Sequence, residues 1–193
     1  MFSKRLSDLN AAVASCIYSD REGPLHENDA LQLFYHMMRE TVAKQGIIYV
    51  IGNGGSAGIA SHFSNDLMKA LRIASQTLYD SNLMTCLAND LGYENVFSYP
   101  LERLMKSTDL LVAISSSGQS PNILKAVEVA LAKSAAVITL SGFKAENALR
   151  KQGNLNFWVD RCDYGLVETA HFFLLHTVID LWSRAPLTVM EYV

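Results

Sequence analysis

Four ionisable side chains are spaced so that they can work in pairs on two helices. His62 and Asp66 are four residues apart and would share one helix face. Glu168 and His176 are eight residues apart and would share a stripe of a later helix. An imidazole and a carboxylate that meet can act as general acid and base, or can bind a metal through nitrogen and oxygen. The competing interpretation is an ordinary surface pair, since such contacts are common and weak.

The later segment also carries His171, and residues 170–179 read AHFFLLHTVI. This stretch is too apolar for a solvated helix face, so the setting favours a functional role for His171 and His176. A buried histidine with a polar partner is the alternative interpretation for either one. His26 and His36 have no comparable surroundings, and we expect them to be structural.

A serine-rich loop follows one of the apolar runs, and residues 114–122 read ISSSGQSPN. Ser120 is a natural helix N-cap and Pro121 a natural first helical residue. The hydroxyls of Ser115, Ser117 and Ser120, together with free backbone N–H groups, could donate to a phosphate without any lysine or arginine. The alternative is that serine and glycine simply form a turn here.

A glycine-rich loop of the same kind reads IGNGGSA over residues 51–57. Its glycines let the backbone approach a ligand closely, and Ser56 is expected to cap the following helix. The spacing also fits the G-x-G-x-x-A fingerprint of dinucleotide-binding proteins. The acidic residue that this fingerprint requires about twenty positions later is missing, since Arg72 stands there. Two loops that each follow a buried strand and open a helix favour a phosphate site.

Short apolar runs alternate with amphipathic segments over most of the chain. The runs predict strands at residues 47–51, 76–79, 110–114, 137–140 and 155–159. The segments between and after them predict helices at residues 57–71, 94–105, 121–133, 145–151 and 165–182. This alternation indicates the α/β class, with a doubly wound parallel sheet covered on both faces.

The first part of the chain has a different pattern. Residues 4–45 predict two helices separated by a break at Glu22-Gly23-Pro24, with Asn28 or Asp29 as the cap of the second helix. We therefore divide the chain into an N-terminal helical arm, residues 1–45, and an α/β domain, residues 46–193, within a single structural unit.

The composition argues against several classes of protein. Half of the 193 residues are hydrophobic, 18% are charged, and the net charge is -3, whereas a nucleic-acid binder normally has a basic surplus. No run approaches the roughly 20 apolar residues of a membrane span. Three cysteines without metal-type spacing indicate reduced thiols in a cytoplasmic protein. The low charged fraction indicates apolar surface hidden between subunits.

Three segments together resemble the sugar isomerase (SIS) domain: GNGGSAGIASHFSND from residue 52, SSSGQSPNILKA from residue 115 and VETAHFFLLH from residue 167. More narrowly, residues 30–182 resemble the phosphoheptose isomerases, and the likeness includes LANDLGYENVF at residues 87–97. The resemblance implies a flavodoxin-like doubly wound fold, with the SIS domain at residues 46–193. It also implies a homotetramer whose active sites are shared between subunits.

The resemblance further implies roles for individual residues. The acid and base would be Asp66 and His176, and one zinc ion per subunit would be bound by His62, Asp66, Glu168 and His176. The implied substrate-binding residues are Asn53, Gly54, Ser56, Asp90, Ser115, Ser116, Ser117, Ser120 and Glu168.

Three positions depart from the best-known members of that family. Those members have glutamate where this chain has Asp66, glutamine where it has Glu168, and arginine where it has Ala70. The residues at the first two of these positions are closer to those of a subgroup associated with surface-polysaccharide heptose pathways. Lys69 or Arg72 is available to replace the missing arginine.

The implied activity is the aldose–ketose isomerisation of sedoheptulose 7-phosphate to D-glycero-D-manno-heptose 7-phosphate through an enediol. It belongs to heptose and lipopolysaccharide biosynthesis in bacteria. Two alternatives stay open at this point. One is a non-catalytic partner protein of the same fold, of the type that binds the replication initiator, and the other is an isomerase of another phosphosugar. The retention of His62, Asp66, Glu168 and His176 together favours an enzyme.

Overall fold

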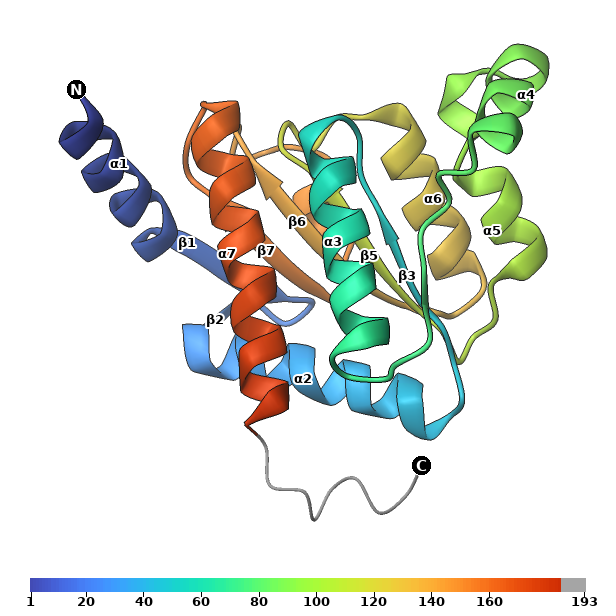
Figure 1. Cartoon of the computed structure of the whole chain (residues 1–193), viewed down its shortest axis with the longest axis horizontal. Helices are drawn as coiled ribbons and strands as arrows, with labels where there is room; N and C mark the ends of the chain where they lie inside the picture. The colour runs from blue at the N-terminus through green and yellow to red at the C-terminus, as the bar shows by residue number, and fades with distance from the viewer. Residues whose placement is uncertain (185–193) are drawn as a thin grey trace.

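A twisted seven-stranded sheet forms the centre of the computed structural model, which describes residues 1–184 (Figure 1). The strand order is β2-β1-β7-β6-β5-β3-β4. The strands are β1 (Cys16–Asp20), β2 (Pro24–Leu25), β3 (Ile48–Ile51), β4 (Ser75–Gln76), β5 (Leu110–Ser115), β6 (Ala136–Gly142) and β7 (Leu155–Val159). The five strands from β3 to β7 are parallel, and their order is that of flavodoxin-like sheets. The predicted doubly wound α/β fold is confirmed.

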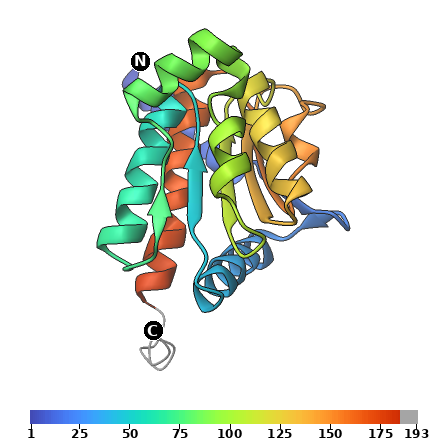
Figure 2. The same cartoon turned by 90° about the vertical axis from the view of Figure 1, so that its right-hand side faces the viewer.

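Helices cover both faces of this sheet (Figure 2). They are α1 (Phe2–Ala14), α2 (Glu27–Ala43), α3 (Gly55–Lys69), α4 (Ser81–Leu91), α5 (Ser98–Leu104), α6 (Pro121–Ala132) and α7 (Tyr164–Ser183). Along β3, Ile48 and Val50 point into the core beneath α2, α3 and α7, whereas Tyr49 and Ile51 point into the core beneath α4, α5 and α6. Burial on both faces explains why the parallel strands read as continuous apolar runs.

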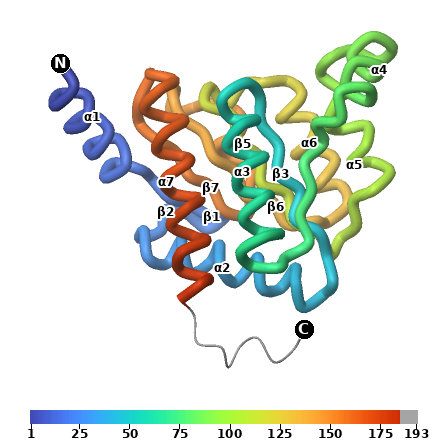
Figure 3. Tube along the Cα trace, in the orientation of Figure 1, coloured from blue at the N-terminus to red at the C-terminus, as the bar shows by residue number. Residues whose placement is uncertain are grey.

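Helices α3 and α7 lie side by side on one face of the sheet (Figure 3). Helix α7 is capped by Asp163, whose carboxylate accepts a hydrogen bond from the backbone N–H of Leu166 at 3.0 Å. Arg5 of α1 binds the same carboxylate through two hydrogen bonds of 2.8 and 2.7 Å. The hydrogen bond from Arg5 is the main reason that the pKa of Asp163 falls to about 2. The N-terminal helix is thereby tied to the helix that carries Glu168 and His176.

The N-terminal prediction of two helices is wrong between residues 15 and 25. Helix α1 ends at Ala14, and the next residues form β1, which pairs antiparallel with β7, and then β2. Tyr18 packs edge-on against Phe157, with 5.3 Å between the ring centroids. Pairing with a distant strand therefore makes this segment a strand, although the spacing of its apolar residues also fits a helix. The boundary between residues 45 and 46 stays a prediction.

Several local expectations also differ from the structure. His26, rather than Asn28 or Asp29, caps α2, and Gly54, rather than Ser56, precedes α3. The strand predicted at residues 76–79 is β4 at Ser75–Gln76, and α4 was not predicted. The helix predicted at residues 94–105 is divided into a 3₁₀ turn and α5, and that predicted at 145–151 is only a 3₁₀ turn at its end. No helix within residues 1–184 is long and apolar enough to span a membrane.

Candidate functional site

The two predicted phosphate loops meet at the carboxyl edge of the sheet. Strands β3 and β5 are parallel neighbours, so the loops that follow them leave the sheet side by side. Between them is a cavity of about 120 Å³. It is lined by Asn53, Ser56, Ser115, Ser116, Ser117, Ser120, Tyr164 and Glu168. Seven of the nine residues expected to bind substrate are thus brought together.

The serine loop offers hydrogen-bonding groups to a cavity that, among the described residues, no lysine or arginine lines. The Ser115 and Ser120 hydroxyls lie 3.1 Å apart, and the Ser117 hydroxyl accepts from the backbone N–H of Gln119 at 3.3 Å. The Ser116 hydroxyl is buried and has no partner among the residues that the structure describes. A buried hydroxyl without a partner destabilises a protein unless a ligand or water bonds to it. Together with the start of α6, this loop has the chemistry of an anion site.

Glu168 closes the cavity from the side of α7. A Cβ atom at Gly55 would lie only 2.2 Å from the Glu168 carboxylate, so this approach requires glycine at the start of α3. Burial raises the pKa of Glu168 above the ordinary value of a glutamate.

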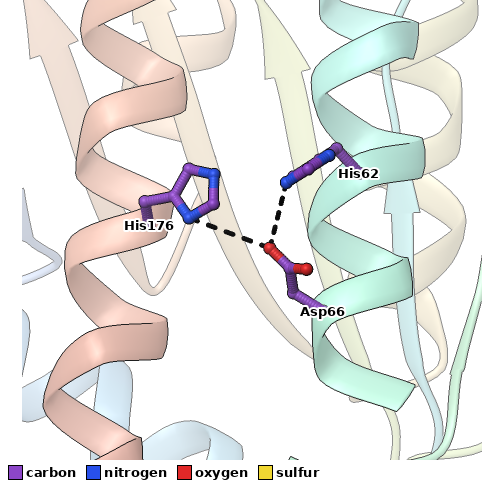
Figure 4. Close-up of side chains that lie close together, drawn as sticks. All are labelled: His62, Asp66 and His176. Carbon is purple, nitrogen blue, oxygen red and sulfur yellow. Dashed lines mark ion pairs between the residues drawn. The ribbon is translucent and has the colours of Figure 1, made fainter. Parts of the chain in front are cut away.

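His62, Asp66 and His176 converge from α3 and α7 (Figure 4). The Asp66 carboxylate lies 3.2 Å from His62 Nε2 and 3.8 Å from His176 Nδ1. Asp66 is the most buried of the three, with 21% of its side chain exposed, against 46% and 40% for the two imidazoles. The expected convergence of the two helices is therefore present in the structure.

This three-residue cluster can serve two kinds of chemistry. Two imidazole nitrogens and a carboxylate oxygen, all within 4.8 Å of one another, are a donor set that zinc accepts. The same groups can move protons as acid and base. Glu168, which the family resemblance gives as a fourth zinc ligand, lies outside this cluster in the structure.

A groove between α3 and α7 borders the cavity at Glu168 and the cluster at His62. Its volume is about 360 Å³, and it is lined by Gly55, Gly58, Ile59, His62, Glu168, Thr169 and Phe172. Glu168 therefore lines both hollows, and His62 is the member of the cluster that lines the groove. His62 is seven residues beyond Gly55 on α3, which corresponds to about 10 Å along the helix axis. A ligand held at the serine loop could thus extend to the cluster.

Two larger hollows, of about 580 and 770 Å³, lie elsewhere on the chain. Neither is lined by any residue that the sequence predicts for the site. The chemistry of the lining, rather than its size, identifies the site at the carboxyl edge.

Two predicted substrate-binding residues do not line the cavity. Gly54 lies in the loop before α3 with φ of +54°. Asp90 is exposed on α4, where its carboxylate accepts hydrogen bonds from the Asn89 amide at 2.8 Å and the Cys86 thiol at 3.5 Å. Their contact with a substrate stays a prediction.

The sequence pattern did not single out Asn122 or Tyr93, although both reach the site. Asn122 follows Pro121 in the serine motif and forms hydrogen bonds with the Asn53 side chain. The Tyr93 hydroxyl also lies 3.2 Å from the Asn53 carboxamide oxygen. The position of Asn122 inside the motif is the one sequence signal that could have identified it.

The buried-histidine interpretation is confirmed for His171. This residue is fully buried, and its Nε2 lies 3.0 Å from the carbonyl oxygen of Ser141, a contact that suits a donating N–H. Burial lowers the pKa of His171 to about 4. His171 is therefore neutral at pH 7 and structural, whereas His176 is partly exposed.

The low pKa of His171 predicts a loss of stability in acid. The unfolded chain binds a proton at this residue near pH 6.5 and the folded chain only near pH 4. The free energy of unfolding should therefore fall as the pH decreases from about 6.5 to 4, by up to about 1.4 kcal/mol per pH unit from this group. Urea unfolding across this range, with an NMR titration of the His171 ring, measures both quantities. A ring that titrates near pH 6.5 in the folded protein would contradict the prediction.

Comparisons with known proteins agree with the geometry. The family model described as SIS domain matches residues 23–142. A phosphoheptose isomerase from Campylobacter concisus is 36% identical over 162 residues, which cover 81% of this chain and 85% of that protein.

Solved structures agree as well. The structure of phosphoheptose isomerase GmhA from Neisseria gonorrhoeae is similar with a TM-score of 0.73 and 29% identity, over 79% of this chain and 85% of that one. A phosphoheptose isomerase from Francisella tularensis has the same fold, with a TM-score of 0.81 and 24% identity over 95% of both chains.

Proposed function

The chain belongs to the SIS domain family and, within it, to the phosphoheptose isomerases, and from this premise we propose that it converts sedoheptulose 7-phosphate to D-glycero-D-manno-heptose 7-phosphate. The observation that carries the proposal is the groove between α3 and α7, which shares Glu168 with the anion cavity and His62 with the His–Asp cluster. The product would enter heptose synthesis for bacterial surface polysaccharides such as lipopolysaccharide.

The length of the groove suits a phosphate far from the reacting carbons. At tetrahedral angles, six C–C bonds of about 1.5 Å each let a seven-carbon chain span about 7.5 Å, and the C–O–P link adds about 2.5 Å. C1 and the phosphorus can thus lie about 10 Å apart, close to the separation between the start of α3 and His62. The phosphate would lie on Ser115, Ser116, Ser117 and Ser120, with Asn53, Gly54, Ser56, Asp90 and Glu168 around the phosphate and the sugar. C1 and C2 would then lie at the cluster.

Asp66 and His176 would share the proton transfers. In the ketose-to-aldose direction, a base removes a proton from C1 while the C2 carbonyl oxygen takes up a proton, which gives the enediol. The enediol then loses the proton from the oxygen on C1 and gains one at C2. The Asp66 carboxylate lies 3.2 Å from His62 Nε2 and 3.8 Å from His176 Nδ1, so Asp66 and His176 are close enough to act on neighbouring carbons of one substrate.

A zinc ion would be held by His62, Asp66 and His176, whose donor atoms fit that metal. When bound, it supplies a Lewis acid that polarises the substrate oxygens. Glu168 remains the expected fourth ligand, although its carboxylate lies at the other end of the groove in the structure.

Removal of divalent metal should lower turnover by about tenfold or more, because the polarised carbonyl is lost. The measurement is activity and zinc content after dialysis against a chelator, followed by addition of zinc. His62→Ala should lose zinc, whereas His36→Ala on α2 should retain it. Full turnover by metal-free protein would contradict the role of zinc.

The assembly that we propose is a homotetramer with shared active sites. Large apolar side chains are exposed on the two helices that Arg5 and Asp163 connect: Phe2 and Leu6 on α1, Phe173 and Leu181 on α7. Such an exposed apolar surface usually marks an interface, where it is buried between copies of the same chain. Light scattering of the purified protein should give four chains per particle.

The three cysteines are free thiols, in keeping with the cytoplasmic location that we propose.

A panel of sugar phosphates tests the proposed function. Purified protein is incubated with sedoheptulose 7-phosphate and with pentose and hexose ketose phosphates, and aldose formation is followed. The highest kcat/KM is expected for sedoheptulose 7-phosphate. Faster turnover of another sugar would assign the enzyme to that phosphosugar, and no turnover of any would favour the non-catalytic partner protein.

A further inference from the structure

Two asparagine side chains join the loops on either side of the serine cavity. The Asn53 Nδ2 donates to Asn122 Oδ1 at 2.9 Å, and the Asn122 Nδ2 donates to Asn53 Oδ1 at 2.9 Å. Asn53 follows β3, and Asn122 lies in the first turn of α6. Asn53 lines the cavity, whereas Asn122 is 2% exposed and does not. The pair therefore connects a buried amide with one that faces the proposed ligand.

One backbone group favours a single orientation of both amides. The Ile123 N–H can only donate; it donates to the Ser120 carbonyl oxygen at 3.0 Å and also lies 3.1 Å from Asn122 Oδ1. The Asn122 oxygen is thus on that side, so its NH₂ group must face the Asn53 oxygen. The Tyr93 hydroxyl, 3.2 Å from Asn53 Oδ1, acts as a second donor to that oxygen. The Asn53 oxygen therefore accepts hydrogen bonds from the Asn122 amide and the Tyr93 hydroxyl.

This orientation leaves one donor unused. An amide NH₂ carries two N–H bonds, and Asn53 uses one of them on Asn122. The other has no partner among residues 1–184. Because Asn53 lines the cavity, that N–H is available to an oxygen of a ligand held there. Rotation of the amide by half a turn would instead present an oxygen, which an anionic ligand repels.

We propose that Asn122 is a positioning residue, assisted by Tyr93, which holds Asn53 as a hydrogen-bond donor to the bound sugar phosphate. The proposal rests on the proposed function, since it assumes a phosphorylated sugar in the cavity. Asn122 acts only through Asn53, so its effect must disappear when the Asn53 side chain is absent. This dependence separates positioning from a general contribution to folding.

A double-mutant cycle tests this dependence. Asn53→Ala, Asn122→Ala and the double variant are compared with the wild type by the KM and kcat for sedoheptulose 7-phosphate and by its Kd from calorimetry. We expect each single variant to raise KM and Kd by about 3- to 10-fold, the worth of a lost hydrogen bond, with a smaller change in kcat. The double variant should be no weaker than Asn53→Ala alone. If the fold-changes in KM and Kd of the two single variants multiply in the double variant, the proposal is overturned.

Tyr93→Phe gives a second test that does not disturb the core. Tyr93 is 53% exposed, so loss of its hydroxyl should leave folding intact. KM and Kd should rise about threefold in the wild type and stay unchanged in the Asn53→Ala background. Tyr99→Phe, a partly exposed tyrosine on α5, is the matched control and should have no effect. An equal effect of Tyr93→Phe in both backgrounds would also overturn the proposal.

The binding measurements separate this proposal from the proposed function. Coupled changes in Kd without turnover by the wild type would support positioning and refute the isomerase activity. If the wild type turns over the sugar phosphate but the two asparagine substitutions act independently, the isomerase activity is supported and the positioning role is refuted. A wild-type protein that neither binds nor turns over the sugar phosphate would refute both.

Discussion

Asp66→Asn and His176→Ala should each lower kcat for sedoheptulose 7-phosphate by about 10²- to 10⁴-fold. The reason is that each removes one of the two groups that we assign to proton transfer between C1 and C2. Asp66→Asn keeps the size of the side chain but can no longer accept a proton at a carboxylate. Steady-state kinetics of both variants, with urea unfolding to show that they are folded, make the measurement.

A second histidine–acid pair on the same chain provides the control. His36 and Glu40 are also four residues apart, with 3.3 Å between Nε2 and the carboxylate, but they lie on α2 and do not belong to the cluster of His62, Asp66 and His176. His36→Ala and Glu40→Gln should retain wild-type kcat within about twofold, since exposed pairs contribute little. If Asp66→Asn and His176→Ala both kept near-wild-type turnover, the assignment of acid and base would be wrong.

Gly118→Ala should impair both stability and substrate binding. Gly118 has φ of +63°, and an added Cβ would lie 1.9 Å from the carboxamide oxygen of Asn147. Asn147 cannot retreat easily, because it is fully buried and forms hydrogen bonds with the carbonyls of Gly142 and Lys144 and the N–H of Arg150. Backbone strain and a broken hydrogen bond together should cost on the order of 3 kcal/mol of unfolding free energy.

The same substitution should displace the serine loop in the folded fraction. A shift of about 1 Å in groups that hold a substrate can lower the rate about 10²-fold, so kcat/KM should fall by that order. Urea unfolding and kinetics measure the two effects. Gly23→Ala is the control, because Gly23 also has a positive φ, of +150°, but no atom lies within 4 Å of an added Cβ. A Gly118→Ala protein with the stability and KM of Gly23→Ala would show that the contact with Asn147 does not matter.

The parallel sheet could be predicted from the sequence because its strands are buried on both faces. Runs such as residues 110–114 are continuously apolar, and all of β5 is buried. The strand at Cys16–Asp20 could not be predicted in this way. The neighbouring β2 pairs only with Tyr18 and Ser19, and the full strand gains its partner when β7, more than a hundred residues later, is folded beside it.

The serine loop also follows from local chemistry. Ser120 and Pro121 begin α6 where the sequence predicts, and the loop before them leaves a strand that the apolar run identifies. Gly118 and its positive φ belong to the same motif. Local backbone preferences act over a few residues, so a motif of nine residues contains most of the information about its own shape.

The sequence by itself determined which side chains share a helix face: His62 with Asp66 on α3, and Glu168 with His176 on α7. Only the tertiary structure decided that Asp66 and His176 meet at 3.8 Å, while Glu168 lies against Gly55 beside the serines. Only the tertiary structure joined Asn53 to Asn122. Helical periodicity orders side chains along one element, whereas contacts between elements depend on how two surfaces pack over the whole sheet.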